Sequence, residues 1–351
     1  MRLHPAGTSL PNHGRRARRA RLCLTAASGI AVLLSAAACS NSVNGGGTVS
    51  NTITIAAVPG IADAPLYLAR KEGLFSAAGL SNVVIKTYPT AAKALNALQN
   101  AQADIAGVDY GNIFAAQAQS GSKNLLRILA DGYDAQAGVL QVLTMPGRST
   151  NPLDLAGKKI AVPSDGVIGN TPSGEPISLD SAAAAQVLSS FLGNNVGSVQ
   201  WVKMPQGQEV NALAHGRGNL AAILVSQPYV YQAEQQYGAV DMFDAASGFT
   251  ANLPLSGYAA MNAWARANPE AVADFKSAIA RAQSQASMAG PIQTVLPEAA
   301  GVQQQAADLV TVGSYPTTTS VSELGRVVRL MVGFHMLPDS AVNLSSMLNG
   351  S

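Results

Sequence analysis

The chain has 351 residues, of which 48% are hydrophobic and 12% are charged, so it can bury a large core and is long enough for two lobes. This composition excludes a disordered chain. The formal net charge is +2, but the first 38 residues hold six Arg and no acid, and the remainder carries 16 basic and 20 acidic residues, or −4. The charge therefore gives no support to nucleic-acid binding.

Residues 1–38 are typical of an export signal. A basic block from Arg15 to Arg21 precedes the apolar run 22–38, and small residues lead up to Cys39. A transmembrane anchor is the alternative. The run has only about 17 residues and is rich in Ala, Ser and Gly, which is short and weakly apolar for a span. We therefore expect residues 1–38 to be a signal peptide.

Cys39 is the only cysteine that the exported chain would keep, because Cys23 lies in the signal, so no disulfide is expected. The stretch LLSAAACS resembles a bacterial lipoprotein signal, in which the cysteine becomes the lipidated N-terminus. The Gly/Ser/Asn-rich residues 39–51 would then form a flexible tether. Ala36 departs from that signal, which prefers Leu there, and ordinary secretion after residues 36–38 is the alternative.

From residue 52 onward, strand-like and helix-like segments alternate. Four β-rich segments predict strands, at 52–58, 83–88, 104–108 and 124–130. Between them we expect a helix from Pro65 to a stop at Gly73, a helix capped by Thr90, and a helix over 111–121. This spacing predicts right-handed βαβ units and a mostly parallel sheet.

The same alternation starts again at KKIAVP (158–163), and from about Ser256 the chain turns helical, with its clearest helix over 269–287. We expect one discontinuous lobe, 52–140 plus 250–351, and a second lobe, 141–249. The chain would cross between the lobes near 137–147 and near 245–257.

Four stretches in order resemble the solute-binding proteins of ABC importers for nitrate, sulfonates and taurine, a family that also includes thiamine-pyrimidine binders. They are PLYLARKEGLFSAAGL (65–80), ALQNAQADIAGVDYGNIFAAQAQSG (97–121), PLDLAGKKIAVPS (152–164) and GYAAMNAWARANPEAVADFKSAIARA (257–282). The resemblance implies an α/β type II periplasmic-binding-protein fold, with two lobes, a ligand cleft and a helical C-terminus. It also implies a monomeric lipoprotein outside the cytoplasm that captures a small organic solute of the sulfonate, nitrate, taurine or pyrimidine class by hinge closure. Its partners would be a permease and an ATPase.

The first of these stretches is expected to be scaffold. Stops at Gly73 and Gly79 let a helix pack on the sheet and turn through Leu74 and Phe75, which plug the core. The chain departs from the family in a long Gly/Pro-rich insertion at 164–181, where family site residues cannot be transferred.

Catalysis finds little support in the sequence. Only His215 and His335 remain outside the signal, far apart, and we find no cysteine cluster, Walker loop, GxSxG elbow or GxGxxG after a strand. We expect no catalytic residue, metal or cofactor, and we expect His215 to end a helix. The alternative is an enzyme of the same fold, similar to the yeast-type pyrimidine synthase, which uses a Lys-bound cofactor and a cysteine-rich motif. The absence of Cys beyond residue 39 argues against it.

Candidate binding residues lie on seven loops expected at the lobe interface, where strand ends and helix N-termini converge. The loops are 59–64, 109–112, 131–136, 163–181, 204–209, 226–229 and 252–258. The ligand-binding candidates within them are Asp63, Asp109, Tyr110, Asn112, Tyr133, Ser164, Asp165, Ser181, Gln227 and Tyr229. Structural alternatives exist: Asp109 as a helix cap, Tyr110 and Tyr133 as core residues, and Gln227 as part of a turn.

The seven loops contain eight acids and no Lys or Arg. Anions are usually bound by Arg or Lys, so this skew predicts a neutral or cationic solute. The loops also hold four tyrosines, Tyr110, Tyr133, Tyr229 and Tyr258, whose faces suit a ring or a cation. The alternative is an anion held by helix N-termini without a basic side chain.

Overall fold

The computed structural model describes residues 52–122, 124–148, 150–168, 175–288 and 290–349. The expected signal peptide, Cys39 and nearly all of the tether lie outside the described residues. The strands are β1 (Ile53–Ala57), β2 (Val83–Thr87), β3 (Ile105–Asp109), β4 (Leu126–Asp134), β5 (Leu140–Thr144), β6 (Lys159–Pro163), β7 (Gln200–Met204), β8 (Leu220–Ser226), β9 (Val240–Asp244) and β10 (Pro254–Met261).

Helices follow most of the strands. The α-helices are α1 (Ala64–Lys71), α2 (Leu74–Ala77), α3 (Ala91–Gln99), α4 (Tyr110–Gln119), α5 (Leu179–Leu192), α6 (Gln208–Ala214), α7 (Tyr229–Tyr237), α8 (Asn262–Ala267), α9 (Pro269–Ala286), α10 (Leu296–Ala300), α11 (Gln304–Ala307), α12 (Val321–Gly333) and α13 (Leu344–Asn349). Short 3₁₀ helices are η1 (Ile61–Asp63), η2 (Pro152–Leu155), η3 (Gly193–Ser198), η4 (Arg217–Asn219), η5 (Gly248–Thr250) and η6 (Ile292–Thr294). None of these described helices is long and apolar enough to cross a membrane.

Local signals explain where several helices begin and end. The Thr90 side chain accepts a hydrogen bond from the Lys93 amide at 3.2 Å and caps α3, as the sequence predicts. Ser178 caps α5 through a reciprocal pair of bonds with Ser181. His215 lies at the C-cap of α6, which confirms its expected place at a helix end.

The strands form two five-stranded mixed sheets. Sheet 1 has the order β2-β1-β3-β10-β4 and sheet 2 the order β7-β6-β8-β5-β9. In each sheet one strand runs antiparallel to both of its neighbours: β10 in sheet 1 and β5 in sheet 2. In each sheet the other four strands run in the same direction, as predicted. The two exceptions are the strands that enter their sheet directly from the other sheet.

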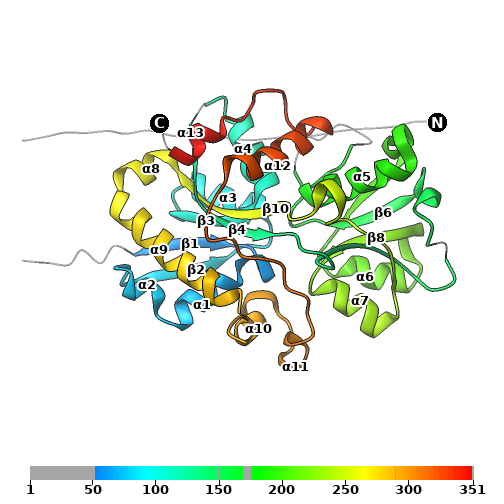
Figure 1. The fold of residues 1–351 in the computed structure, drawn as a ribbon, viewed down its shortest axis with the longest axis horizontal. Helices are drawn as coiled ribbons and strands as arrows, with labels where there is room; N and C mark the ends of the chain where they lie inside the picture. The colour runs from blue at the N-terminus through cyan, green and yellow to red at the C-terminus, as the bar shows by residue number, and fades with distance from the viewer. Residues whose placement is uncertain (1–51, 123, 149, 169–174, 289, 350–351) are drawn as a thin grey trace, which may run out of the picture. The chain divides into compact units, whose positions relative to one another are not determined.

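Helices cover both faces of both sheets (Figure 1). In sheet 1, α1 and α9 lie on one side and α3 and α4 on the other, while α5 faces α6 and α7 across sheet 2. Leu74 and Phe75 are buried, and the Phe75 ring stacks on Phe275 at 6.3 Å. The scaffold role predicted for this turn is confirmed, because both side chains fill the core between α2 and α9.

Two segments, 135–139 and 245–253, connect the sheets. They run side by side, because the Ala135 amide bonds the Leu253 carbonyl at 3.0 Å and the Asn252 amide bonds the Ala135 carbonyl at 2.9 Å. The predicted crossings overlap both segments but extend into β5 and β10, whose hydrophobic residues pair within the sheets. The Arg326 guanidinium donates to the Phe249 and Ala251 carbonyls at 2.7 and 2.6 Å, and so ties α12 to the second segment.

Candidate functional site

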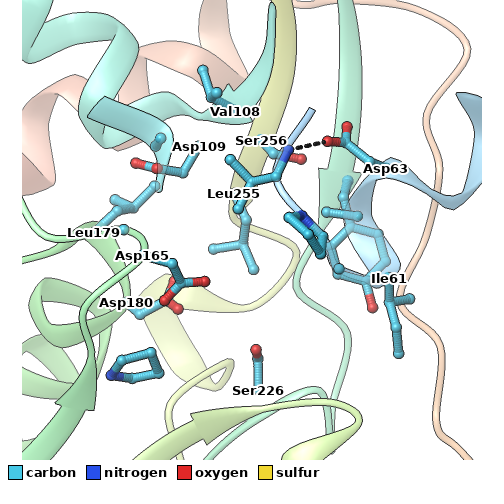
Figure 2. Close-up of a pocket in the computed structure, with 18 of the residues that line it drawn as sticks. Ile61, Asp63, Val108, Asp109, Asp165, Leu179, Asp180, Ser226, Leu255 and Ser256 are labelled. Atoms are coloured by element: carbon cyan, nitrogen blue, oxygen red, sulfur yellow. Dashed lines mark hydrogen bonds between the residues drawn. The ribbon is translucent and has the colours of Figure 1, made fainter. Parts of the chain in front are cut away.

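A cavity of about 140 Å³ lies between the two sheets (Figure 2). Its first wall comes from sheet 1 and its helices, at residues 58–63, Ala91, 107–109, Tyr133 and 255–256. Its second wall comes from sheet 2 and its helices, at Pro163, Asp165, Gly166, 178–180, Gln206 and 226–227. The ends of the parallel strands β1, β3, β6 and β8 therefore meet at the cavity, which is where α/β sheets bind ligands.

Five of the ten candidate residues line the cavity: Asp63, Asp109, Tyr133, Asp165 and Gln227. Tyr133 presents its ring only, since its hydroxyl accepts a hydrogen bond from the Gly313 amide at 2.7 Å. Gln227 is 8% exposed and bonds the Gly138 carbonyl at 3.2 Å, so it also holds the first connecting segment. Of these five, Asp63 and Asp165 have the most capacity left for a ligand.

Tyr110 and Ser181 do not line the cavity, because the first turns of their helices point them into the core. Tyr110 is fully buried, stacks on Phe114 and donates its hydroxyl to Asp131 at 2.8 Å. Ser181 is fully buried and completes the capping box of α5.

The other three candidates also have structural partners. The Ser164 amide continues the ladder between β6 and β7 by bonding the Met204 carbonyl at 2.7 Å. Tyr229 packs on Gly207, where φ is +80° and a β-carbon would meet the ring. The Asn112 side chain donates to the Gly166 carbonyl at 3.0 Å, so it spans the cleft instead of facing the cavity.

The two walls contact each other at the edge of the cavity. Beside the bond from Asn112 to Gly166, the Ala91 amide at the start of α3 donates to the Asp165 carbonyl at 2.9 Å. The first amides of a helix have no partner within it, and here one of them is satisfied from the opposite wall. The cleft is thus held closed by direct hydrogen bonds.

Asp63 lies in the first wall and is only 4% exposed. Its Oδ2 accepts a hydrogen bond from the Val58 amide at 3.2 Å, which Figure 2 draws as a dashed line, and no bond to Oδ1 forms within the described part of the chain. Burial raises the pKa of Asp63 to about 7, because the charged form loses its hydration. The hydroxyls of Tyr67 and Tyr258 behind it are buried and likewise lack a described partner.

Asp109 and Asp180 both stand at helix starts, and burial raises the pKa of each to about 7. Asp109 caps α4 and accepts bonds from the Asn112 amide and side chain at 2.8 and 3.0 Å. Asp180 lies inside α5 after its cap, and its carboxylate forms no hydrogen bond or ion pair with any residue that the structure describes.

Asp165 lies beside Asp180 in the second wall, as Figure 2 shows. Burial raises its pKa, while its own amide and that of Gly166 oppose the shift. Glu209 lies behind this wall, fully buried, with one carboxylate oxygen bonded to the Gly207 amide and the other without a described partner. Burial raises the pKa of Glu209 to about 7. The second wall therefore gathers three carboxyl groups.

The sequence model of the family described as NMT1/THI5 like matches residues 62–293. The chain belongs to the NMT1/THI5-like family. That match includes the lining residues of both walls except for residues 58–61, which follow β1, so most of the cavity lies in the region that the family shares. No curated protein sequence matches the chain significantly.

Several solved structures resemble this NMT1/THI5-like chain. The alkanesulfonate-binding protein SsuA of Xanthomonas axonopodis, bound to MOPS, has a TM-score of 0.63 at 16% identity over 85% of this chain and 97% of its own. The nitrate-binding protein NrtA of Synechocystis has a TM-score of 0.62 at 14% identity, covering 82% and 83%. A ligand-binding component of an ABC-type import system from Staphylococcus aureus, with zinc bound, has a TM-score of 0.67 at 12% identity, covering 85% and 95%. The expected type II periplasmic-binding-protein fold is confirmed.

Some lining residues of this NMT1/THI5-like cavity were not among the candidates. Asp180, Ser256 and Gln206 fall within the seven expected loops but were not selected. Gly107 and Ala91 lie outside those loops, within β3 and at the start of α3. The rule that ligands lie at strand ends and helix starts covers both residues: Gly107 lies two residues before the loop 109–112, whereas Ala91 belongs to the loop after β2, which was not among the seven.

The tyrosine argument does not carry over to the structure. Of the four tyrosines in the expected loops, Tyr133 alone lines the cavity, whereas Tyr110 and Tyr258 are at most 1% exposed. A stacked ring therefore has one candidate aromatic face instead of four. The acid argument is different, because Asp63, Asp109, Asp165 and Asp180 all line the cavity and no Lys or Arg does so among the described residues.

Proposed function

We propose that this protein is the extracytoplasmic solute-binding component of an ABC importer. The observation that carries the proposal is the cavity itself, which is enclosed by two sheets and built from strand ends of both. A solute held there would contact both walls at once. The structural likeness to sulfonate-binding and nitrate-binding proteins supports the same role.

Capture would work by hinge closure about the two connecting segments. A solute that contacts both walls stabilises the closed arrangement, in which Asn112 and Ala91 bond across the cleft. The permease would then recognise the closed form. The two segments suit a hinge. Among the described residues, they alone run directly from a strand of one sheet to a strand of the other.

An enzyme of the same fold is the second candidate, favoured by the THI5 part of the family description. A pyrimidine-synthase-like reaction would need a Lys for its cofactor and a cysteine-rich motif. The described lining contains neither Lys, His nor Cys, so it offers no such attachment point. The polar side chains in the described lining are carboxylates, hydroxyls and two amides, which can bind a solute through hydrogen bonds.

Native mass spectrometry of the purified protein distinguishes these two functions. A binding protein should carry one small molecule per chain, and that molecule should be released with an unchanged mass after prolonged incubation. Conversion of the released molecule into a product of different mass would identify an enzyme instead.

Membrane attachment through Cys39 is a separate part of the proposal, supported by the LLSAAACS signal. Metabolic labelling with palmitate should mark the protein, and Cys39→Ser should remove the label. Retention of label by the variant would exclude this anchor. Stable attachment needs more than one acyl chain, as bacterial lipoproteins have.

A further inference from the structure

The walls of the cavity carry negative charge without a compensating base. Asp63 and Asp109 face it from the first wall and Asp165 and Asp180 from the second, and the described lining contains no Lys or Arg. Residues 169–174, which the structure does not describe, have the sequence Gly-Asn-Thr-Pro-Ser-Gly and hold no base either. A solute therefore meets carboxylates on both sides.

These carboxylates differ in how much bonding capacity they have left. Asp109 is fully engaged by Asn112 and the start of α4. Asp180 has no described partner, and Asp165 has only nearby backbone amides. Hydrogen bonds to a charged group are roughly twice as strong as neutral ones, so the Asp165 and Asp180 pair is the strongest acceptor in the cavity.

Asp63 is an independent sign of a missing donor. Asp63 is only 4% exposed and lines the cavity. Its Oδ1 accepts no hydrogen bond from a described residue. A carboxylate oxygen that accepts no hydrogen bond from the protein and lines a cavity is free to accept one from a solute or water. A donor placed in the cavity would satisfy it.

Anion binding by helix N-termini, the alternative left open by the sequence, would meet helices of which one N-terminal amide each is already bonded. The first amide of α3 bonds the Asp165 carbonyl. At α4 the Asn112 amide bonds Asp109, and at α5 the Ser181 amide bonds Ser178. Two of the helix starts also carry an aspartate, which repels an anion.

A metal ion is a poor fit as well. No group of three or more His, Cys, Asp or Glu side chains in the described parts of the chain is arranged to hold one. Burial of Asp63, Asp109 and Asp180 raises each pKa to about 7, and a positively charged solute would reverse that shift by favouring the ionised form.

We propose that the cavity binds a small organic cation with several N–H groups, an amine, amidine or guanidine, which donates to the Asp165 and Asp180 pair and to Asp63 on the opposite wall. This assignment rests on the proposed binding function and specifies its solute. The cavity volume of about 140 Å³ suits a compact molecule, since each water-sized position needs roughly 10–15 Å³.

The test is capture from a defined mixture, read out by mass spectrometry after the unbound solutes are removed. The mixture contains alkyl amines, amidines and guanidines, the uncharged amides and ureas of the same chain lengths, and the matching carboxylates and sulfonates. Enrichment of the cations is the expected result. Enrichment of anions or uncharged solutes would overturn the cation assignment and leave the binding function standing, whereas capture of nothing would overturn both.

Variants then locate the binding charge. Asp180→Asn and Asp165→Asn should each lower the affinity for the captured cation by about 10- to 100-fold, because each removes one charge-assisted hydrogen bond. Asp308→Asn is the matched control, because it makes the same change in net charge at an exposed position away from the cavity. An equal effect of all three variants, or none from the cavity pair, would overturn the assignment.

Discussion

Each wall of the cavity places an aspartate near the start of a helix, and the two aspartates have different roles. Asp109 in the first wall follows β3 and caps α4, and Asp180 in the second wall lies in the first turn of α5. Ser178 already caps α5, so the Asp180 carboxylate is left without a described partner. The Asp109 carboxylate thus stabilises a helix of the first wall, whereas the Asp180 carboxylate of the second wall stays available for a solute.

The largest expected effect concerns two glycines, one in each wall. A β-carbon at Gly107 would meet Asp63 Oδ1 and lie 3.0 Å from the Tyr258 ring, whereas one at Gly166 would make only an ordinary contact of 3.7 Å with Asp109. Gly107→Ala should lower the free energy of unfolding by about 1–3 kcal/mol, as overpacking does. Urea unfolding should show no such loss for Gly166→Ala. Similar stabilities of the two variants would contradict the tight packing of the first wall.

The next largest effect concerns the stability of variants at Asp109 and Asp180. Asp109→Ala removes a helix cap and should cost about 0.5–2 kcal/mol of unfolding free energy. Asp180→Ala removes a half-buried carboxyl group without a described partner and should leave stability unchanged or raise it. Urea unfolding at pH 7 measures both. A greater loss from Asp180→Ala than from Asp109→Ala would reverse the assignment of roles.

A smaller effect appears in the pH dependence of the ligand-free protein. Asp63, Asp109 and Asp180 have pKa values of about 7 when folded, above the unfolded value near 4. The folded state therefore binds more protons between these values, so their contribution is full below about pH 4 and is lost as the pH rises through 7. The free energy of unfolding should fall between pH 5.5 and pH 8, by at most about 1.4 kcal/mol per pH unit for each group, and the Tm should fall with it.

Asp180→Asn should flatten this profile, because it removes one titrating group and lowers the repulsion on its neighbours Asp165 and Asp109. Exposed Asp308→Asn is again the control. A Tm that rises over this range in the wild type, or an unchanged slope in Asp180→Asn, would show that these carboxyl groups stay ionised in the folded protein.

The smallest effect is a change of shape. Asn112→Ala removes a hydrogen bond between the walls and should shift the ligand-free protein toward a more open form, seen as a larger radius of gyration in solution scattering. Ser164→Ala serves as control, since its described bond uses the backbone only. Identical scattering curves of Asn112→Ala and the wild type would indicate that this bond does not hold the cleft closed.

Local patterns predicted most of the fold, because alternating strands and helices with clear caps leave few arrangements. Thr90, His215 and the buried turn at Phe75 follow from neighbours within a few residues in sequence. The antiparallel strands β5 and β10 were not predicted, because their partners are far away in the chain. Pairing over such distances depends on the whole fold.

The candidate site was predicted at the level of loops and less well at the level of side chains. Strand ends located the cavity, but the partner of each polar group decides whether it faces a solute. The Tyr110 hydroxyl donates a hydrogen bond to Asp131, and the Asn112 side chain donates one to the Gly166 carbonyl. Folding brings both partners near. Asp180 is available because Ser178 caps its helix, and the spacing from Ser178 to Ser181 was the one sequence signal of that cap.

The most direct test of a solute site between the walls is calorimetric titration of the captured solute into the wild type and Gly166→Leu. Gly166 lines the cavity and does not have a positive φ, so a larger side chain there can fill the space without backbone strain. The Tm of the variant should stay close to that of the wild type, while its affinity falls at least about 100-fold, or about 2.7 kcal/mol. Equal affinities in two folded proteins would place the solute elsewhere.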